Sequence, residues 1–294
     1  MKKILSLLML LCITFGANAQ LLWKISGNGL SRPSYVFGTH HLAPISIVDS
    51  VADFKQALHE VEQVYGEVAL SEMVSPANIQ KIQQASILQG DTTLHMVLTK
   101  TQYDSVALVV KQLMGVDLKM FDKVKPAFLT TQIAALLAMK SIKGFNPQEQ
   151  LDQWIQTEGK KLGKTVGGLE TIDFQMYVLF NSQSVERQAE LLYHAVTNLE
   201  ESEQQTQRLN TAYMRQDLEE LEAIATEKKG NGSDPLPEEE ETLVYGRNAN
   251  WAKILPAIMK EKSTLVAVGS AHLPGERGLL NLLKKQGFTV EPVN

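Results

Sequence analysis

The chain has 294 residues, 44% hydrophobic and 21% charged, which is enough apolar material to bury a substantial core. Its formal net charge is -5, and no basic stripe suited to a phosphate backbone follows from this composition. Nucleic acid is therefore excluded as an expected partner, and we expect a globular protein.

The start of the chain has the pattern of an export signal. Two lysines precede an apolar run from Ile4 to Phe15, and Ala17 and Ala19 are the small residues of a cleavage site. The run is shorter than the roughly 20 residues that a spanning helix needs. The sequence predicts a signal peptide over residues 1–19 and a bacterial protein that is periplasmic or secreted.

Cysteine chemistry is excluded from the predicted mature chain. Cys12 is the only cysteine and lies inside the predicted signal, so no disulfide, cysteine nucleophile or thiolate metal site is possible after cleavage. Lipid attachment at Cys12 is disfavoured because bulky Leu11 precedes it. No later stretch is apolar enough to cross a bilayer, so we expect no transmembrane segment in the mature chain.

The first elements of the mature chain predict an α/β unit. Residues 22–25 and 34–37 are short β-type runs separated by turn residues, which is typical of a hairpin. Apolar residues recur at helical spacing over 51–61, and residues 64–69 form another strand candidate. Strand, helix and strand in this order predict a sheet covered by helices.

Helical patterns dominate from residue 75 to 161. Residues 94–114 and 127–139 carry apolar positions at helical spacing, and Pro126 and Pro147 mark breaks. We interpret this stretch as a helical insertion within a single domain over residues 20–294. Four methionines fall on its apolar faces and are expected in the core: Met96, Met114, Met120 and Met139.

The second half returns to the sheet. Residues 165–170 form a strand candidate, and a long helical region follows over 171–229 with a break near Asn181. The acidic run 238–241 is expected to start a solvated helix capped by Asp234 or a neighbour. Residues 263–268 predict a strand buried on both faces, followed by a helix over 279–285 and a last strand. The fold class is therefore α/β, with a mixed central β-sheet, flanking helices and a large helical insertion.

Two strand candidates end in the same pattern, glycine followed three residues later by histidine. Gly38 leads to His41, and Gly269 leads to His272. Open α/β sheets bind ligands at the carboxyl ends of their strands, so the two imidazoles converge if the strands are neighbours. His40 and His41 cannot both point inward from an extended chain, and the repeated spacing favours His41.

Two carboxylates also end strand candidates. Glu67 and Glu170 lie in apolar or glycine-rich surroundings, where an unpaired carboxylate is costly. With His41 and His272 they would form a nitrogen and oxygen site suited to zinc, manganese or cobalt. Such an ion would acidify a bound water, and the spare carboxylate would act as general base. Arg247 shares a helix face with Trp251 and either packs on it, steadies a glutamate or holds a substrate carboxylate.

These motifs together resemble the TraB/GumN family, which also contains the Tiki proteins. The resemblance covers nearly all of the predicted mature chain in the same order: residues 22–42, the two glycine-to-histidine motifs, 168–170 with Gln175, Arg247 with Asn248, and 268–288. It implies a fold akin to the erythromycin-esterase-like and ChaN-like proteins.

The resemblance also implies a chemistry. Tiki proteins are described as metal-dependent proteases that trim the amino terminus of Wnt ligands, and this carries over onto His41, His272 and Glu67, with Glu170 and Arg247 as site neighbours. Two departures are visible. Tiki proteins carry a membrane anchor after this domain, whereas this chain ends at Asn294, and the His-Glu-x-x-His motif of zinc proteases is absent.

The favoured interpretation is an exported metal-dependent hydrolase, a peptidase of the Tiki-like type that uses the two histidines and a glutamate on a peptide or small-molecule substrate. One alternative is a non-catalytic protein that holds a ligand, a metal or haem in the same cleft. Another is a metal-independent, esterase-like hydrolase with a histidine as general base. Sequence alone does not identify the substrate, the metal or the oligomeric state.

Overall fold

Residues 20–293 are described in a computed structural model, and the predicted signal peptide with Cys12 lies outside the described residues. Within this range no helix has the length and apolar character needed to span a bilayer. The prediction of a single domain with an insertion remains a prediction.

The centre of the molecule is a six-stranded mixed sheet in the order β4-β3-β5-β2-β1-β6. Strands β4, β3, β5 and β2 run parallel to one another, whereas β1 runs antiparallel to both β2 and β6. The expected mixed α/β sheet is confirmed. The strands are β1 (Leu22–Gly27), β2 (Ser34–Thr39), β3 (Gln63–Val68), β4 (Thr165–Glu170), β5 (Thr264–Gly269) and β6 (Phe288–Pro292).

The predicted hairpin is present as β1 and β2, with Leu22 opposite Phe37. Strand β2 is buried at every position and β5 at all but the last, as expected for strands covered on both faces. A Cβ on Gly38, near the end of β2, would lie in tight contact at 3.2 Å from the backbone of Ser270, and glycine avoids this contact. This close approach lets the two motifs that end in histidine lie side by side.

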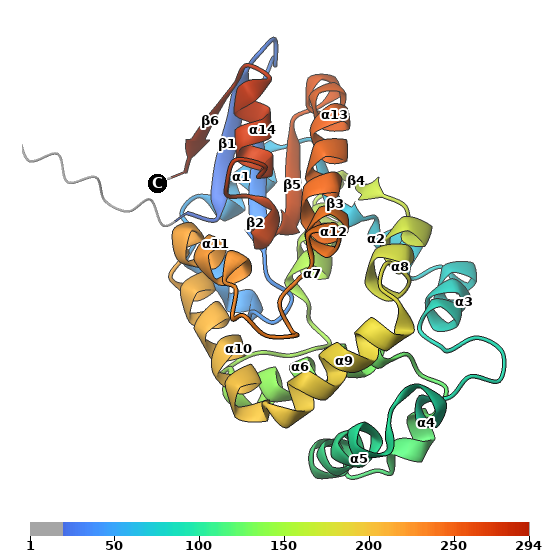
Figure 1. The fold of residues 1–294 in the computed structure, drawn as a ribbon. Helices are drawn as coiled ribbons and strands as arrows, with labels where there is room; N and C mark the ends of the chain where they lie inside the picture. Colours follow the sequence, from blue (N-terminus) through green and yellow to red (C-terminus); the bar gives the residue numbers. More distant parts are fainter. Residues whose placement is uncertain (1–19, 294) are drawn as a thin grey trace, which may run out of the picture.

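Helices surround this sheet, with α13 and α14 in front of it and α1 behind it in Figure 1. The helices are α1 (Phe54–Glu60), α2 (Leu70–Met73), α3 (Pro76–Ala85), α4 (Leu94–Val97), α5 (Lys100–Met114), α6 (Pro126–Ser141), α7 (Leu151–Lys161), α8 (Ile172–Phe180), α9 (Val185–Thr197), α10 (Leu199–Met214), α11 (Leu218–Thr226), α12 (Pro237–Glu240), α13 (Gly246–Glu261) and α14 (Leu279–Lys285). Short 3-10 helices are η1 (Ile45–Asp49), η2 (Leu118–Phe121) and η4 (Ser270–His272), and η3 (Glu241–Tyr245) is a π-helix.

The helices away from the sheet have a core of their own. Leucine, isoleucine and valine side chains from α4, α5, α6 and α9 form a separate apolar cluster, and the sheet packs in another. The carboxyl ends of β2 and β5 point toward α6, α9 and α10 in Figure 1. The helical layer therefore faces the edge of the sheet where the two histidine motifs end.

Several predictions of detail were wrong. The methionine expectation holds for Met114, which packs against the helical core, but Met96, Met120 and Met139 are 69%, 72% and 52% exposed. Met96 lies in four-residue α4 and Met120 in 3-10 helix η2, so the assumed continuous helical period does not apply to them. The cap expected at Asp234 or a neighbour is the neighbour Leu236, and the Asp234 carboxylate instead accepts hydrogen bonds from the backbone of residues 229 and 230. The break expected near Asn181 is present between α8 and α9, but two further breaks, which were not expected, divide the rest of 171–229 into α9, α10 and α11.

Candidate active site

Four of the residues singled out from the sequence lie together at the carboxyl edge of the sheet. Glu67 is next to last in β3, Glu170 ends β4, His272 follows β5 through η4, and Arg247 lies in the first turn of α13. Strands β4, β3 and β5 are parallel neighbours, so their carboxyl ends meet at one edge. Strand pairing therefore brings these distant residues together.

Arg247 joins both carboxylates. Its Nε donates to Glu170 Oε1 at 2.7 Å, and its Nη2 donates to Glu67 Oε2 at 2.5 Å and to Glu170 Oε2 at 3.2 Å. The side chains are 8%, 11% and 4% exposed for Arg247, Glu67 and Glu170. A buried cation between two carboxylates keeps both in fixed positions.

The remaining Arg247 donors are also used. Nη1 donates to the carbonyl oxygen of Leu243 at 3.1 Å and lies 3.2 Å from His272 Nε2, and the guanidinium stacks on the Trp251 ring at 4.8 Å. All five guanidinium N–H groups therefore have acceptors. This arrangement favours the roles of packing on Trp251 and steadying the glutamates over binding a substrate carboxylate.

A π-helix positions this arginine. Residues Glu241–Tyr245 form η3 immediately before α13, and its carbonyl at Leu243 accepts from Arg247. A π turn widens the helix by one residue and is frequent at functional sites. The sequence offers no pattern that predicts this turn.

The contacts of His272 determine its protonation state. Arginine has no acceptor atoms, so His272 Nε2 must present a lone pair to Arg247, and Nδ1 must carry the proton that is donated to Asn248 Oδ1 at 2.7 Å. Asn248 is held in this orientation because its Nδ2 donates to the carbonyl oxygens of His272 and Arg277. Burial lowers the pKa of His272 to about 4, so its imidazole is neutral at pH 7.

The two glutamates have different ionisation properties. Burial raises the pKa of Glu170 above its usual value, although Arg247 opposes this. Burial acts in the same direction on Glu67, but Arg247 and a hydrogen bond from Gly269 N–H to Oε1 at 2.9 Å outweigh it and hold its pKa below the usual value. Glu67 also accepts from Gln175 Nε2 at 3.1 Å. Glu67 is therefore the more acidic of the two carboxyl groups.

His41 lies in a second group of side chains beyond the end of β2. Its Nδ1 forms an ion pair with Asp152 Oδ2 at 2.9 Å, and Asp152 Oδ1 accepts from the hydroxyl of Thr39. The Asp152 carboxylate raises the pKa of His41 to about 9, with a smaller contribution from Glu67. The ring is 61% exposed, so this imidazolium is open to solvent.

His40 points away from this group. Its ring packs on Tyr213 with 5.3 Å between centroids, and its Nε2 is buried without a hydrogen-bond partner. Burial lowers the pKa of His40 to about 4. Among residues 20–293, no hydrogen bond joins His41 to Arg247 or the glutamates, so the site consists of two adjacent groups.

The profile of the TraB/PrgY/gumN family matches residues 21–292. The chain belongs to this family. Two curated relatives from zebrafish (Danio rerio) are "Metalloprotease TIKI1", 22% identical over 92% of this chain, and "Metalloprotease TIKI2", 21% identical over 92%. This TraB/PrgY/gumN chain covers 62% and 60% of their own lengths, and no solved structure matches it.

The donor types of this TraB/PrgY/gumN site suit a divalent ion, but their arrangement does not hold one. In the described part of the chain, no three His, Cys, Asp or Glu side chains are grouped closely enough to bind a metal. Glu67 Oε1 lies 3.9 Å from His272 Nε2, and the lone pair that His272 would give to an ion is the one that accepts from Arg247. An ion could bind there only after Arg247 withdraws.

Sequence reasoning missed one residue of the site. Asp152 lies in the first turn of α7, and residues around it resemble any acidic start of a helix. Its partners Thr39 and His41 are more than a hundred residues away in the chain. Side chains of an extended chain alternate between two faces, so Thr39 and His41 are expected on one side and His40 on the other. This alternation was the only signal in the sequence that linked a partner of Asp152 to the site.

Proposed function

We propose that the chain is an exported hydrolase that cleaves a peptide bond at the carboxyl edge of its sheet. The observation that carries this proposal is the opposite shift of two histidines: Asp152 raises the pKa of His41 to about 9, and burial lowers that of His272 to about 4. When the surroundings push the pKa values of two titratable groups apart, one group can serve as a proton donor at neutral pH while the other stays neutral. Similarity to two proteins named as metalloproteases supports a peptide substrate.

His41 is the general acid in this proposal. It is protonated at neutral pH, and Asp152 holds Nδ1, so Nε2–H is left to face the substrate. When the scissile C–N bond breaks, His41 gives this proton to the leaving nitrogen. Solvent returns a proton to His41 after the products leave.

Glu67 is the general base. Its Oε1 accepts one hydrogen bond, from Gly269, so a lone pair remains for a water molecule. Glu67 takes the proton of this water while the water oxygen attacks the carbonyl carbon, and it releases the proton to solvent after the products leave. Arg247 and Glu170 position Glu67. The neutral His272 ring lies beside Glu67 Oε1 and adds no charge there.

Metal-dependent hydrolysis is the second candidate function. It is favoured by His272, whose Nδ1–H is fixed by Asn248, because a second hydrogen bond of this kind orients metal-binding histidines. Manganese, cobalt or zinc would be held by His41, His272 and Glu67 once Arg247 had moved, and would supply a more acidic bound water.

The test is cleavage of a peptide library by the mature chain, with and without chelator, alongside metal analysis after addition of manganese, cobalt or zinc. We expect Glu67→Gln and His41→Gln to lose about a hundredfold or more in kcat/KM, and exposed His59→Gln on α1 to retain full activity. Activity that survives chelation supports the acid–base proposal. If the chain binds stoichiometric metal that Glu67→Gln loses, and chelator stops cleavage, the acid–base proposal is wrong and metal-dependent hydrolysis takes its place.

Failure to cleave any peptide would overturn the peptidase proposal. Turnover of ester substrates would then favour esterase-like hydrolysis. Binding of a small ligand, metal or haem without turnover would favour the non-catalytic alternative.

A further inference from the structure

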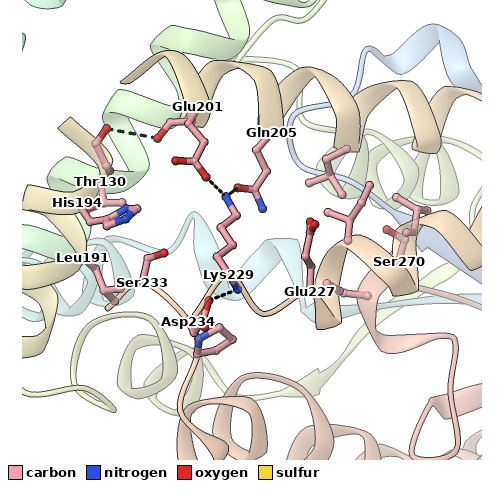
Figure 2. Close-up of a pocket in the computed structure, with 18 residues that line it drawn as sticks. Thr130, Leu191, His194, Glu201, Gln205, Glu227, Lys229, Ser233, Asp234 and Ser270 are labelled. Atoms are coloured by element: carbon pink, nitrogen blue, oxygen red, sulfur yellow. Dashed lines mark hydrogen bonds and ion pairs between the residues drawn. The ribbon is translucent and has the colours of Figure 1, made fainter. Parts of the chain in front are cut away.

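A cavity of about 540 Å³ lies between the helical layer and the end of β5. Figure 2 shows Ser270 on one side of this cavity and Thr130 and His194 on the opposite side. Ser270 and Ala271, which separate Gly269 from His272, form part of its wall. Because Gly269 N–H donates to Glu67, the cavity begins beside the proposed catalytic groups. Its size is in the range of pockets that hold ligands.

The long walls of the cavity are largely apolar. Leu191 of α9, Leu209 of α10, and Leu221 and Ile224 of α11 line it, with alanines at 195 and 225 leaving space between them. Leu221 and Ile224 are almost completely buried, so the wall is firmly packed from behind. Apolar walls gain free energy when an apolar group replaces water.

The charged groups in the wall are already compensated. Each carboxylate of the lining has a partner: Glu201 pairs with Lys229 at 2.6 Å, Asp234 accepts from the backbone of residues 229 and 230, and Glu227 pairs with Arg208 at 2.7 Å. The Lys229 ammonium also donates to Gln205, as the dashed lines of Figure 2 indicate. These pairs leave no unpaired carboxylate or ammonium in the lining to attract a charged occupant, and the apolar walls suit a neutral one.

We infer that this cavity is the specificity pocket of the enzyme and takes a bulky apolar side chain of a peptide substrate next to the scissile bond. The inference rests on the proposed function and adds a substrate class to it. Leu191 and Leu209, which are partly exposed, provide the contact surface, and the peptide backbone passes Ser270 on its way to Glu67. A leucine-like or phenylalanine-like residue is selected over glycine, alanine or a charged residue.

Filling the cavity tests this selectivity. Ala225→Trp on α11 and Ala195→Trp on α9 place bulk on different walls, and Ala223→Trp is a matched control because it is exposed on α11 but is not part of the lining. Profiling of library cleavage should show at least a tenfold loss of kcat/KM for substrates with a bulky apolar residue in both filled variants. Cleavage of the corresponding alanine substrates should persist, and Ala223→Trp should match the unaltered chain.

A binding measurement separates this inference from the proposed function. The probes are a fluorescein-labelled hexapeptide with a central leucine and the same peptide with glycine, titrated by anisotropy into the His41→Gln variant to prevent turnover. At least tenfold tighter binding of the leucine peptide, abolished by Ala225→Trp or Ala195→Trp, supports the pocket even if no cleavage is found. Equal affinity for both peptides, or a preference that survives both filled variants, overturns the pocket even if the chain proves to be a peptidase.

Discussion

At the scale of single residues, the Asp152 carboxylate determines how His41 titrates. It is the largest cause of the rise in the pKa of His41 to about 9 from an ordinary 6.5. Replacing Asp152 by asparagine removes that charge, so the pKa of His41 should fall toward 6.5. Because the general acid must be protonated, the alkaline limb of kcat/KM should move to lower pH by the same amount, with little change at pH 5.

Histidine ring NMR and pH–rate profiles would measure this change together. Asp173→Asn is the control, because that carboxylate is exposed and pairs with Lys81 away from the cleft. An unchanged His41 titration in Asp152→Asn would show that the ion pair does not control the imidazole. A shifted titration with an unchanged rate profile would remove His41 from the role of general acid.

Arg247 is the second residue whose removal has a calculable effect. Arg247→Met leaves Glu67 and Glu170 buried without their cation, and breaking a buried pair by removing one partner costs about 3–5 kcal/mol. Urea denaturation should show this loss. Arg208→Met breaks two exposed pairs, where water screens the charges, and should cost less than about 1 kcal/mol. Equal losses in the two variants would contradict the structural role of Arg247.

The sequence predicted one part of this site and not the other. Glu67, Glu170 and His272 end strands, and strands that are parallel neighbours bring their ends together, so their meeting follows from local patterns plus the sheet order. Asp152 reaches the site from a helix whose docking depends on packing across the whole core. Local sequence carries no information on such a contact.

At the scale of elements, one arginine attaches the loop between α11 and α12 to α9. Arg187 pairs with Glu239 at 2.9 Å and also donates to the carbonyl oxygens of Gly232 and Asp234. Glu239 is buried, at 6% exposure, and the Arg187 side chain is mostly covered, at 14%. The loop that carries Ser233 and Asp234 into the cavity wall therefore depends on this contact.

Arg187→Met should loosen this loop. Glu239 would remain buried without a cation, so we expect about 3 kcal/mol lower stability and faster hydrogen exchange over residues 228–240. Hydrogen exchange mass spectrometry would locate the effect. Lys140→Met breaks a more exposed pair with Glu203 and should leave the loop unchanged. Exchange that is uniform along the chain, or unchanged over 228–240, would be inconsistent with a local anchor.

The elements also show where sequence patterns stop being informative. Strands with continuous apolar runs, such as β5, were predicted within one or two residues because burial on both faces leaves a clear pattern. The helical layer was predicted as helical but not divided correctly, since Thr99 begins a new helix through a capping box after α4 ends. The π-helix η3 has no pattern in the local sequence that predicts it, although its Leu243 carbonyl accepts from Arg247.

At the scale of the whole molecule, three histidines with shifted pKa values should give the free energy of unfolding a maximum near pH 6.5. His40 and His272 have folded pKa values of about 4, below the ordinary 6.5, so acid between pH 6.5 and 4 protonates the unfolded chain first and favours unfolding. His41 has a folded pKa of about 9, so its contribution is complete below pH 6.5 and is lost as pH rises through 9. Stability therefore falls below pH 6.5 because of His40 and His272, and it falls above pH 6.5 because of His41.

The alkaline side can be assigned to a single residue. Urea midpoints between pH 6 and 9.5 should fall for the unaltered chain, and His41→Gln should remove most of that fall because its side chain has no proton to lose. The acid side should be unchanged in this variant, since His40 and His272 remain. Because the His41 ring is 61% exposed, water screens its ion pair, and the slope should be shallower than a fully buried pair would give. Parallel curves for the two proteins above pH 6.5 would show that the His41–Asp152 pair does not stabilise the fold, and the fall would then belong to other groups.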